Sequence, residues 1–330
     1  MNTGKNSTLE LLKLFASYMV VFIHILFYGK LGVTVDALAR FAVPFFFLVS
    51  GYYSYQITTL KIKKRIKNIL ILFAFSAVCC TAFEIIRLLK YNTDGLVTLI
   101  NKFTKVSTYV DLIVFNVPVS SGHLWYLLAV LYVYIIFYFI TKFQIEEKII
   151  FTVSLLLLLL HIFLGEGLSI FGTTLPMHFV RNFALMGIPF FSLGLFVKKH
   201  EEKLRGVPNY LIYLLLIIGA FESVFSRFFF DANELYVGSI FILIALVCVF
   251  IKGANVKYPA FLTALEGCST YIYVSHIAIA TVITIIFSIV GIDIYSSTTL
   301  ENLYPIAVCF ASTIFAYVLI KILKRKRTHQ

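Results

Sequence analysis

The chain has 330 residues, of which 60% are hydrophobic and only 13% are charged, and its net charge is +12. About 25% of the residues in a typical soluble domain are charged. The composition therefore indicates a polytopic membrane protein and excludes a soluble domain that carries one anchor. In a membrane protein, positive charge is typical of cytoplasmic loops that face anionic lipid, so we expect membrane lipids as partners and no nucleic acid.

Ten hydrophobic segments have the length and composition of transmembrane helices. They predict an all-α fold, a polytopic membrane helix bundle of about ten transmembrane helices. The first segment, about 20 residues long, has the length of a span and not of a signal-peptide core. Residues 96–117 are apolar only in patches and are expected to form a short interfacial or re-entrant element. The predicted spans are residues 9–28, 37–57, 69–89, 123–140, 148–164, 178–197, 210–227, 236–251, 269–291 and 302–323.

Basic residues favour one orientation of these spans. With the N-terminus in the cytoplasm, 19 of the 28 lysines and arginines lie on the inner side and 5 on the outer side, and the remaining four lie inside spans. Because cytoplasmic loops carry the excess of basic residues in membrane proteins, we expect both termini to be cytoplasmic.

The first span carries Lys13, Ser17 and His24 on one helix face. Eleven residues make about three helical turns, so Lys13 and His24 point in nearly the same direction and lie roughly 16 Å apart along the axis. Ionisable groups at membrane depth are costly and by default mark a functional pathway. The alternative is a lysine that snorkels to the interface and a core histidine bonded to a backbone carbonyl.

Further polar residues are predicted in the outer half of the membrane. Charged groups at this depth should face the bundle interior or a wet cavity, so together they predict a polar pocket that opens outward. Taken singly, the arginines near span ends could snorkel to the interface, and Glu84 and Arg87 could form a pair within one helix. The set consists of His24, Arg40, Glu84, Arg87, His123, His178, Arg181 and Glu222.

On the inner side, residues 61–67 (KIKKRIK) form a dense basic run. This run is either ordinary positive-inside charge in contact with lipid headgroups or a docking site for a phosphorylated cytoplasmic donor. His276 lies about two turns into the ninth span. A functional histidine and a core histidine with satisfied hydrogen bonds are equally good interpretations of this position.

Familiar catalytic motifs are absent, because the sequence has no GxSxG, HExxH, Walker or GxGxxG motif. The five cysteines lie in or beside apolar spans, and none has the spacing of a metal site. We therefore expect no metal, no bound cofactor and no disulfide framework. The cysteines are Cys79, Cys80, Cys248, Cys268 and Cys309.

Five segments in chain order resemble the acyltransferase-3 family of bacterial integral-membrane O-acyltransferases. The family's first span has an acidic residue, a basic residue three positions later and a histidine eleven further on, and Glu10, Lys13 and His24 match it. Many members have arginine at the position of Lys13. A lysine side chain lacks the bidentate fork of arginine. The other similar segments are VPFFFLVSGY (43–52), HLWYL (123–127), RNFALMGIPFFSLG (181–194) and GCSTYIYVSH (267–276).

The resemblance covers nearly the whole chain and implies a single acyltransferase-3-like transmembrane domain, residues 1–330, in a bacterial plasma membrane. It implies transfer of an acyl group, usually acetyl, from cytoplasmic acyl-coenzyme A as co-substrate. The acceptor would be a hydroxyl of an extracytoplasmic cell-surface glycan or a lipid-linked acceptor, so the implied activity belongs to the cell envelope.

The residues can be given physical roles in such a reaction. His24, with Lys13 and Glu10, would form the catalytic group, and His24 would act as general base or as a covalent acyl carrier. The donor would contact Ser17, Lys63, Lys64 and Arg65, since basic side chains attract the phosphates of the coenzyme. The acceptor or the developing oxyanion would be held by Arg40, His123, Arg181 and Glu222.

A carrier is the main rival. Transmembrane domains of the same family are fused to serine racemases and are implicated in moving the amino acid. A carrier for a small amino acid would use the same arginines to clamp a carboxylate near the midplane and would need no coenzyme site. A third interpretation is a structural partner with a degenerate site. The joint presence of Lys13 and His24 favours the enzyme.

Overall fold

The computed structural model describes residues 6–230 and 233–327. It is 82% helical, and the described residues form no strand, which confirms the all-α prediction. Eight helices or helix pairs among the described residues are long and apolar enough to cross a membrane. The helices pack into two compact units, which are described in turn.

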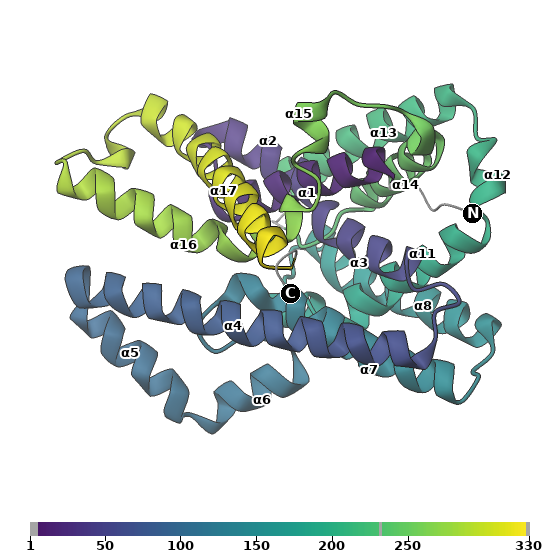
Figure 1. Cartoon of the computed structure of the whole chain (residues 1–330), viewed down its shortest axis with the longest axis horizontal. Helices are drawn as coiled ribbons and strands as arrows, with labels where there is room; N and C mark the ends of the chain where they lie inside the picture. Colours follow the sequence, from purple (N-terminus) through teal and green to yellow (C-terminus); the bar gives the residue numbers. More distant parts are fainter. Residues whose placement is uncertain (1–5, 231–232, 328–330) are drawn as a thin grey trace. The chain divides into compact units, whose positions relative to one another are not determined.

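The first unit consists of Met1–Val43, Glu201–Phe228 and Tyr236–Gln330. Its centre is a seam in which α1 packs against α16, while α16 and α17 lie side by side (Figure 1). The seam is apolar and rich in small residues, such as Cys268, Ala280 and Ala316, which let helix backbones approach closely. The helices of this unit are α1 (Ser7–His24), α2 (Gly29–Ala39), α12 (Glu201–Arg205), α13 (Asn209–Phe229, to its last turn), α14 (Val237–Lys252), η4 (Gly253–Asn255), α15 (Ala260–Thr263), α16 (Cys268–Ile289), η5 (Ile294–Ser296) and α17 (Thr298–Arg327).

The second unit consists of Pro44–His200 and Phe229–Leu235. Within it α4 packs along α7, and α8 packs against α11. Glycines bring α3 and α11 together, because a side chain at Gly51 would meet the Phe191 carbonyl and one at Gly194 would meet the Leu48 carbonyl. The helices are α3 (Ala42–Tyr52), α4 (Thr59–Tyr91), α5 (Thr93–Thr104), α6 (Val106–Val114), η1 (Gly122–Leu124), α7 (Trp125–Lys142), α8 (Glu147–Ile162), η2 (Phe163–Gly167), α9 (Leu168–Ile170), α10 (Met177–Val180), η3 (Phe183–Gly187) and α11 (Ile188–Lys199).

Several boundaries differ from the sequence-based expectation. The first span ends at His24 and not at residue 28. The second begins at Gly29, eight residues before the predicted start, and its helix is interrupted at Arg40 and Phe41 between α2 and α3. The basic run 61–67 is not a loop but the first turns of the 33-residue α4. No glycine or proline interrupts α4, so its helix continues through the run.

The expected sixth span is also interrupted. Asn182 lies between α10 and the π-helical segment η3, and its side chain accepts hydrogen bonds from the Ala184 and Leu185 amides. A side chain that caps the following turn stops the preceding helix. This interrupted segment and the 16-residue α14 are the two expected spans that fall outside the eight long apolar ones. The region 96–117 folds largely as two short helices, α5 and α6.

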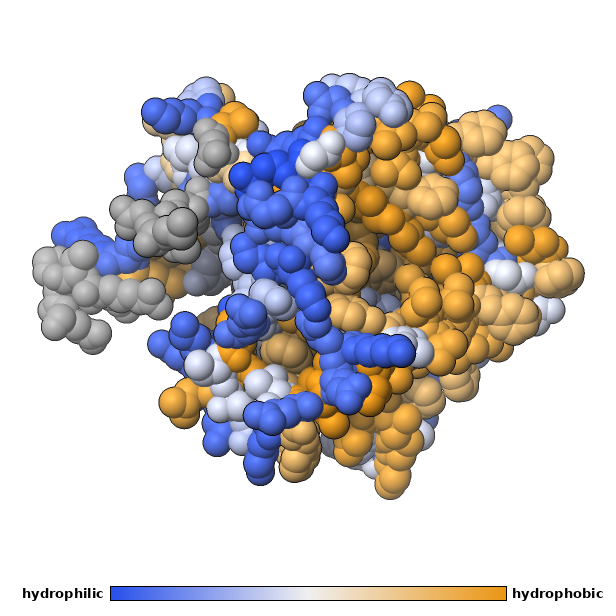
Figure 2. Space-filling view, turned by 90° about the vertical axis from the view of Figure 1, so that its right-hand side faces the viewer, coloured by the Kyte–Doolittle hydropathy of each residue, from blue (hydrophilic) through white to orange (hydrophobic). Residues whose placement is uncertain are grey.

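Large hydrophobic side chains cover much of the surface. Figure 2 shows broad areas of hydrophobic residues on the face that it displays. Phe75, Phe221 and Phe310 are each about 70% exposed, at 69%, 71% and 70%. Exposed apolar surface on this scale is not tolerated in water, so these helix faces contact lipid.

Candidate active site

The beginning of α1 is anchored to the segment between α14 and α16. The Asn6 side chain caps the helix at the Leu9 amide and also donates to the Phe250 carbonyl, each at 3.0 Å. Thr8 donates to the Gly253 carbonyl at 2.6 Å. Three polar side chains in the first helical turn thus bind a segment distant in sequence, since Ser7 also donates to Glu266 at 2.6 Å. These contacts fix the rotation of α1, and with it the direction of its polar face.

Glu10 and Lys13 form a buried ion pair at 2.9 Å on the next turn. The Glu10 side chain is 8% exposed and the Lys13 side chain 20%. The second carboxylate oxygen of Glu10 accepts the Gly267 N–H at 3.2 Å. Gly267 has a φ of +86°, a conformation that favours glycine, at the N-cap of α16. Glu10 therefore neutralises Lys13 and ties it to the beginning of α16.

Ser17 lies between Lys13 and His24 on the same helix but turns its hydroxyl inward. The residue is fully buried, and its Oγ donates to the Leu14 carbonyl at 2.7 Å. A serine that bonds back to its own helix needs no external partner. Contact between Ser17 and the acyl donor therefore remains a prediction.

His24 ends α1 and contacts a second histidine. The His24 and His276 rings have centroids 5.3 Å apart and are tilted by 33°. His24 is partly exposed, whereas His276 on α16 is fully buried. His276 Nδ1 lies 2.8 Å from the Tyr273 carbonyl oxygen. The sequence placed His276 in a core helix but gave no sign that its ring would meet His24.

Arg40 belongs to a cluster with two charged partners. Its guanidinium donates to Asp36 at 2.6 Å, and Arg227 on α13 lies 3.4 Å from the other oxygen of the same carboxylate. The Asp36 side chain is only 4% exposed. Two guanidinium groups thus contact one carboxylate among the described residues. Sequence reasoning identified Arg40 but neither Asp36 nor Arg227 as its partner.

Glu222, the other predicted acceptor residue of the first unit, contacts its own helix α13 and the neighbouring α14. Its carboxylate accepts hydrogen bonds from the Ser226 hydroxyl and from the Gly238 amide at the beginning of α14. These contacts show that Glu222 joins α13 to α14. A role in acceptor binding remains a prediction.

The two predicted acceptor residues of the second unit have separate partners. Arg181 lies 4.0 Å from Glu234 and stacks over the Trp125 ring at 5.4 Å. His123 is buried, and its Nε2 lies 3.9 Å from the Cys80 Sγ. Glu84 and Arg87 form the pair within one helix that the sequence offered as an alternative, with atoms as close as 2.6 Å.

The basic run on α4 divides into bound and exposed side chains. Arg65 donates to Ser54 at 2.7 Å, to Tyr134 at 2.9 Å and to the Tyr53 carbonyl at 2.8 Å. Arg65 thus fastens α4 to α7 and to the end of α3. Lys63 is exposed above the Tyr138 ring, and Lys64 is exposed. The lysines are therefore better placed than Arg65 to meet a phosphate.

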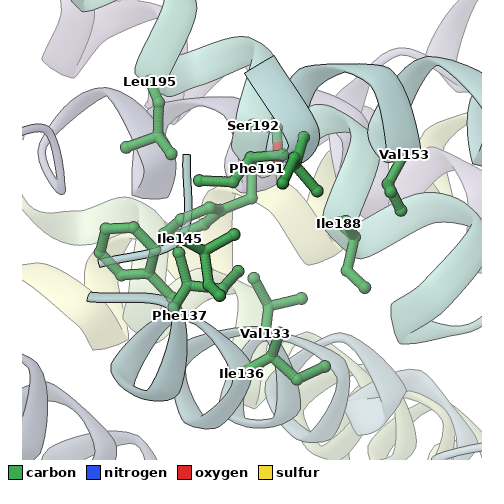
Figure 3. Close-up of a pocket in the computed structure, with 12 residues that line it drawn as sticks. Val133, Ile136, Phe137, Ile145, Val153, Ile188, Phe191, Ser192 and Leu195 are labelled. Carbon is green, nitrogen blue, oxygen red and sulfur yellow. The ribbon is translucent and has the colours of Figure 1, made fainter. Parts of the chain in front are cut away.

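Two apolar pockets lie away from these residues. The pocket of Figure 3, about 140 Å³, is enclosed by α7, α8 and α11, and Ser192 supplies the single polar side chain of its lining. A wider groove of about 750 Å³ runs along α1 and α17, past Tyr18 and Thr313. Neither contains a predicted catalytic residue. The described residues include no group of three or more histidine, cysteine, aspartate or glutamate side chains that could hold a metal.

Comparisons with known proteins address the whole chain. Searches among curated proteins and among solved structures found no match. The sequence profile of a family described as an acyltransferase domain matches residues 6–321. The match includes the Glu10, Lys13 and His24 pattern and every other segment that carried the resemblance. The chain therefore belongs to the acyltransferase-3 family of membrane acyltransferases.

Proposed function

We propose that the protein is a membrane O-acetyltransferase of the bacterial plasma membrane, with both termini in the cytoplasm. Acetyl-coenzyme A on the inner side would supply the acyl group, and a hydroxyl of a cell-surface glycan or lipid-linked acceptor on the outer side would receive it. The observation that carries this proposal is α1, which holds the Glu10–Lys13 pair at one end and His24 at the other. A single helix of this kind would link the donor side to the acceptor side.

His24 is the proposed general base. One ring nitrogen would take the proton of the acceptor hydroxyl, whose oxygen would attack the thioester carbonyl. The carbon–sulfur bond would break, and the thiolate of coenzyme A would leave and take a proton from the imidazolium. His24 occupies the C-terminal end of α1, where the helix dipole stabilises the positive charge that forms during the reaction.

The donor is proposed to bind first on the basic run. Lys63 and Lys64 are exposed, so they would attract the phosphates of the coenzyme. The partly exposed Lys13 would then meet the thioester arm. Arg40 and Arg181 are the proposed acceptor residues.

The test of the chemistry compares wild type with His24→Ala. Membrane vesicles would receive acetyl-coenzyme A with a radiolabelled acetyl group, and the label in the envelope polymers would be measured. Loss of a general base should lower the transfer rate by roughly 10²–10⁴-fold. Equal transfer by both proteins at matched expression would contradict the proposal. Uptake of a labelled amino acid that depends on His24, without acyl transfer by wild type, would support the carrier.

The donor site has its own test. The double variant Lys63→Gln and Lys64→Gln should bind acetyl-coenzyme A more weakly, and wild-type binding should weaken at high ionic strength. Arg65 stays unchanged because it fastens α4. The matched control, Lys142→Gln with Lys148→Gln, removes two exposed lysines from another predicted inner segment. If both double variants bound acetyl-coenzyme A with the same affinity, the basic run would be ordinary positive-inside charge and not a donor site.

A further inference from the structure

We propose that His276 is a positioning residue for His24, which it holds in one orientation and one tautomer. This inference rests on the proposed function. The two rings come from different helices of the first unit, α1 and α16, and are in contact at a centroid distance of 5.3 Å. The surrounding seam is apolar, with Val21 and Ile25 beside His24 and Ile272 and Ala280 on α16. A polar pair in such a seam fixes how two helices meet.

The hydrogen bond of His276 defines its tautomer. A backbone carbonyl can only accept, so Nδ1 donates to the Tyr273 oxygen at 2.8 Å. In a neutral ring, Nε2 then carries the lone pair and accepts. With this tautomer, Nε2 could receive an N–H from His24 after a rotation of the two rings, whose centroids are 5.3 Å apart in this structure. The second nitrogen of His24 would then keep its lone pair for the acceptor hydroxyl.

Burial decides which histidine meets the substrate. His276 is fully buried, so it cannot touch an acceptor, and a charge on its ring would be costly. His24 is partly exposed and can reach one. In the reaction His24 gains and then loses the proton, and His276 remains neutral while it accepts the hydrogen bond. A base oriented by a third group recurs in nucleophilic and acid–base sites.

Two substitutions of His276 separate positioning from packing. His276→Leu fills a similar volume without an acceptor, whereas His276→Gln keeps an acceptor near the end of the side chain. We expect His276→Leu to lower kcat roughly 10–100-fold, with KM for acetyl-coenzyme A within about twofold and no loss of thermal stability. His276→Gln should recover part of kcat. Thr281→Val, also on α16, is the control, because Thr281 bonds back to the Ile277 carbonyl of its own helix.

A double-mutant cycle makes the inference refutable. If His276 acts through His24, then His276→Leu should have no effect on the residual transfer of His24→Ala. A loss of the same factor in both backgrounds, or a normal kcat for His276→Leu, would overturn the inference. Normal transfer by His24→Ala would overturn the proposed function itself. An inactive His24→Ala beside a fully active His276→Leu would overturn the positioning role alone.

Discussion

Asp36 offers the sharpest test of the first unit's polar core. Its carboxylate is 4% exposed and lies 2.6 Å from Arg40 and 3.4 Å from Arg227. Substitution by asparagine keeps the volume but removes the negative charge that both guanidinium groups contact. Breaking a buried ion pair by removing one partner costs about 3–5 kcal/mol. The arginine side chains are 13% and 24% exposed and can recover some water, so we expect about 3 kcal/mol, near the lower limit.

The assay is reversible unfolding of the purified protein by SDS in mixed micelles. Arg227→Met alone removes only the longer contact and leaves the Asp36–Arg40 pair, so it should cost less than Asp36→Asn. In the double variant, the two costs should not add, because both substitutions remove the same contact between Asp36 and Arg227. An unfolding free energy for Asp36→Asn within about 0.5 kcal/mol of wild type, the effect of an ordinary surface substitution, would refute the reasoning.

Three further outcomes follow. Gly267→Ala should lower the unfolding free energy by about 1–2 kcal/mol in the same assay, because φ is +86° at this position. The strain is in the backbone, since the nearest atom to the added Cβ would be 3.9 Å away. An unchanged unfolding free energy would mean that the backbone relaxes freely. His161→Leu should keep or raise the unfolding free energy, since neither buried ring nitrogen makes a hydrogen bond of normal geometry with the described residues; a clear loss would show that the ring is satisfied by something else. Reporters fused after Lys30 and after Thr328 should report opposite sides of the membrane, and the same side for both would reject the cytoplasmic orientation of the termini.

Apolar length and periodicity were enough to predict the helical class and the approximate spans. They failed where polar side chains end or extend helices. Asn182 caps a turn inside an expected span, and the lysines of residues 61–67 continue a helix that was expected to begin later. Hydropathy detects the apolar part of a helix but not a polar extension, because lysine and arginine are good helix formers.

Charge pairs also divide into those close enough in the sequence to be predicted and those that only the structure shows. Glu10–Lys13, Asp36–Arg40 and Glu84–Arg87 lie three or four residues apart, a spacing that sequence reasoning can use, although only Glu84–Arg87 was identified as a pair in this way. Arg227 approaches Asp36 from 191 positions away. A single sequence does not state which helices are neighbours, so partners of this kind require the structure.

The Glu10–Lys13 pair also explains why lysine can replace arginine at position 13. Its lysine makes one short contact with a carboxylate whose second oxygen is already occupied by the Gly267 N–H. A bidentate fork would compete with that N–H for the carboxylate, whereas a single ammonium leaves it undisturbed. Lysine in place of the family's usual arginine is thus compatible with an anchored Glu10. In the proposed reaction the cation would act by its charge and its position in the first turns of α1, and the geometry specific to the reaction would fall to His24 at the other end.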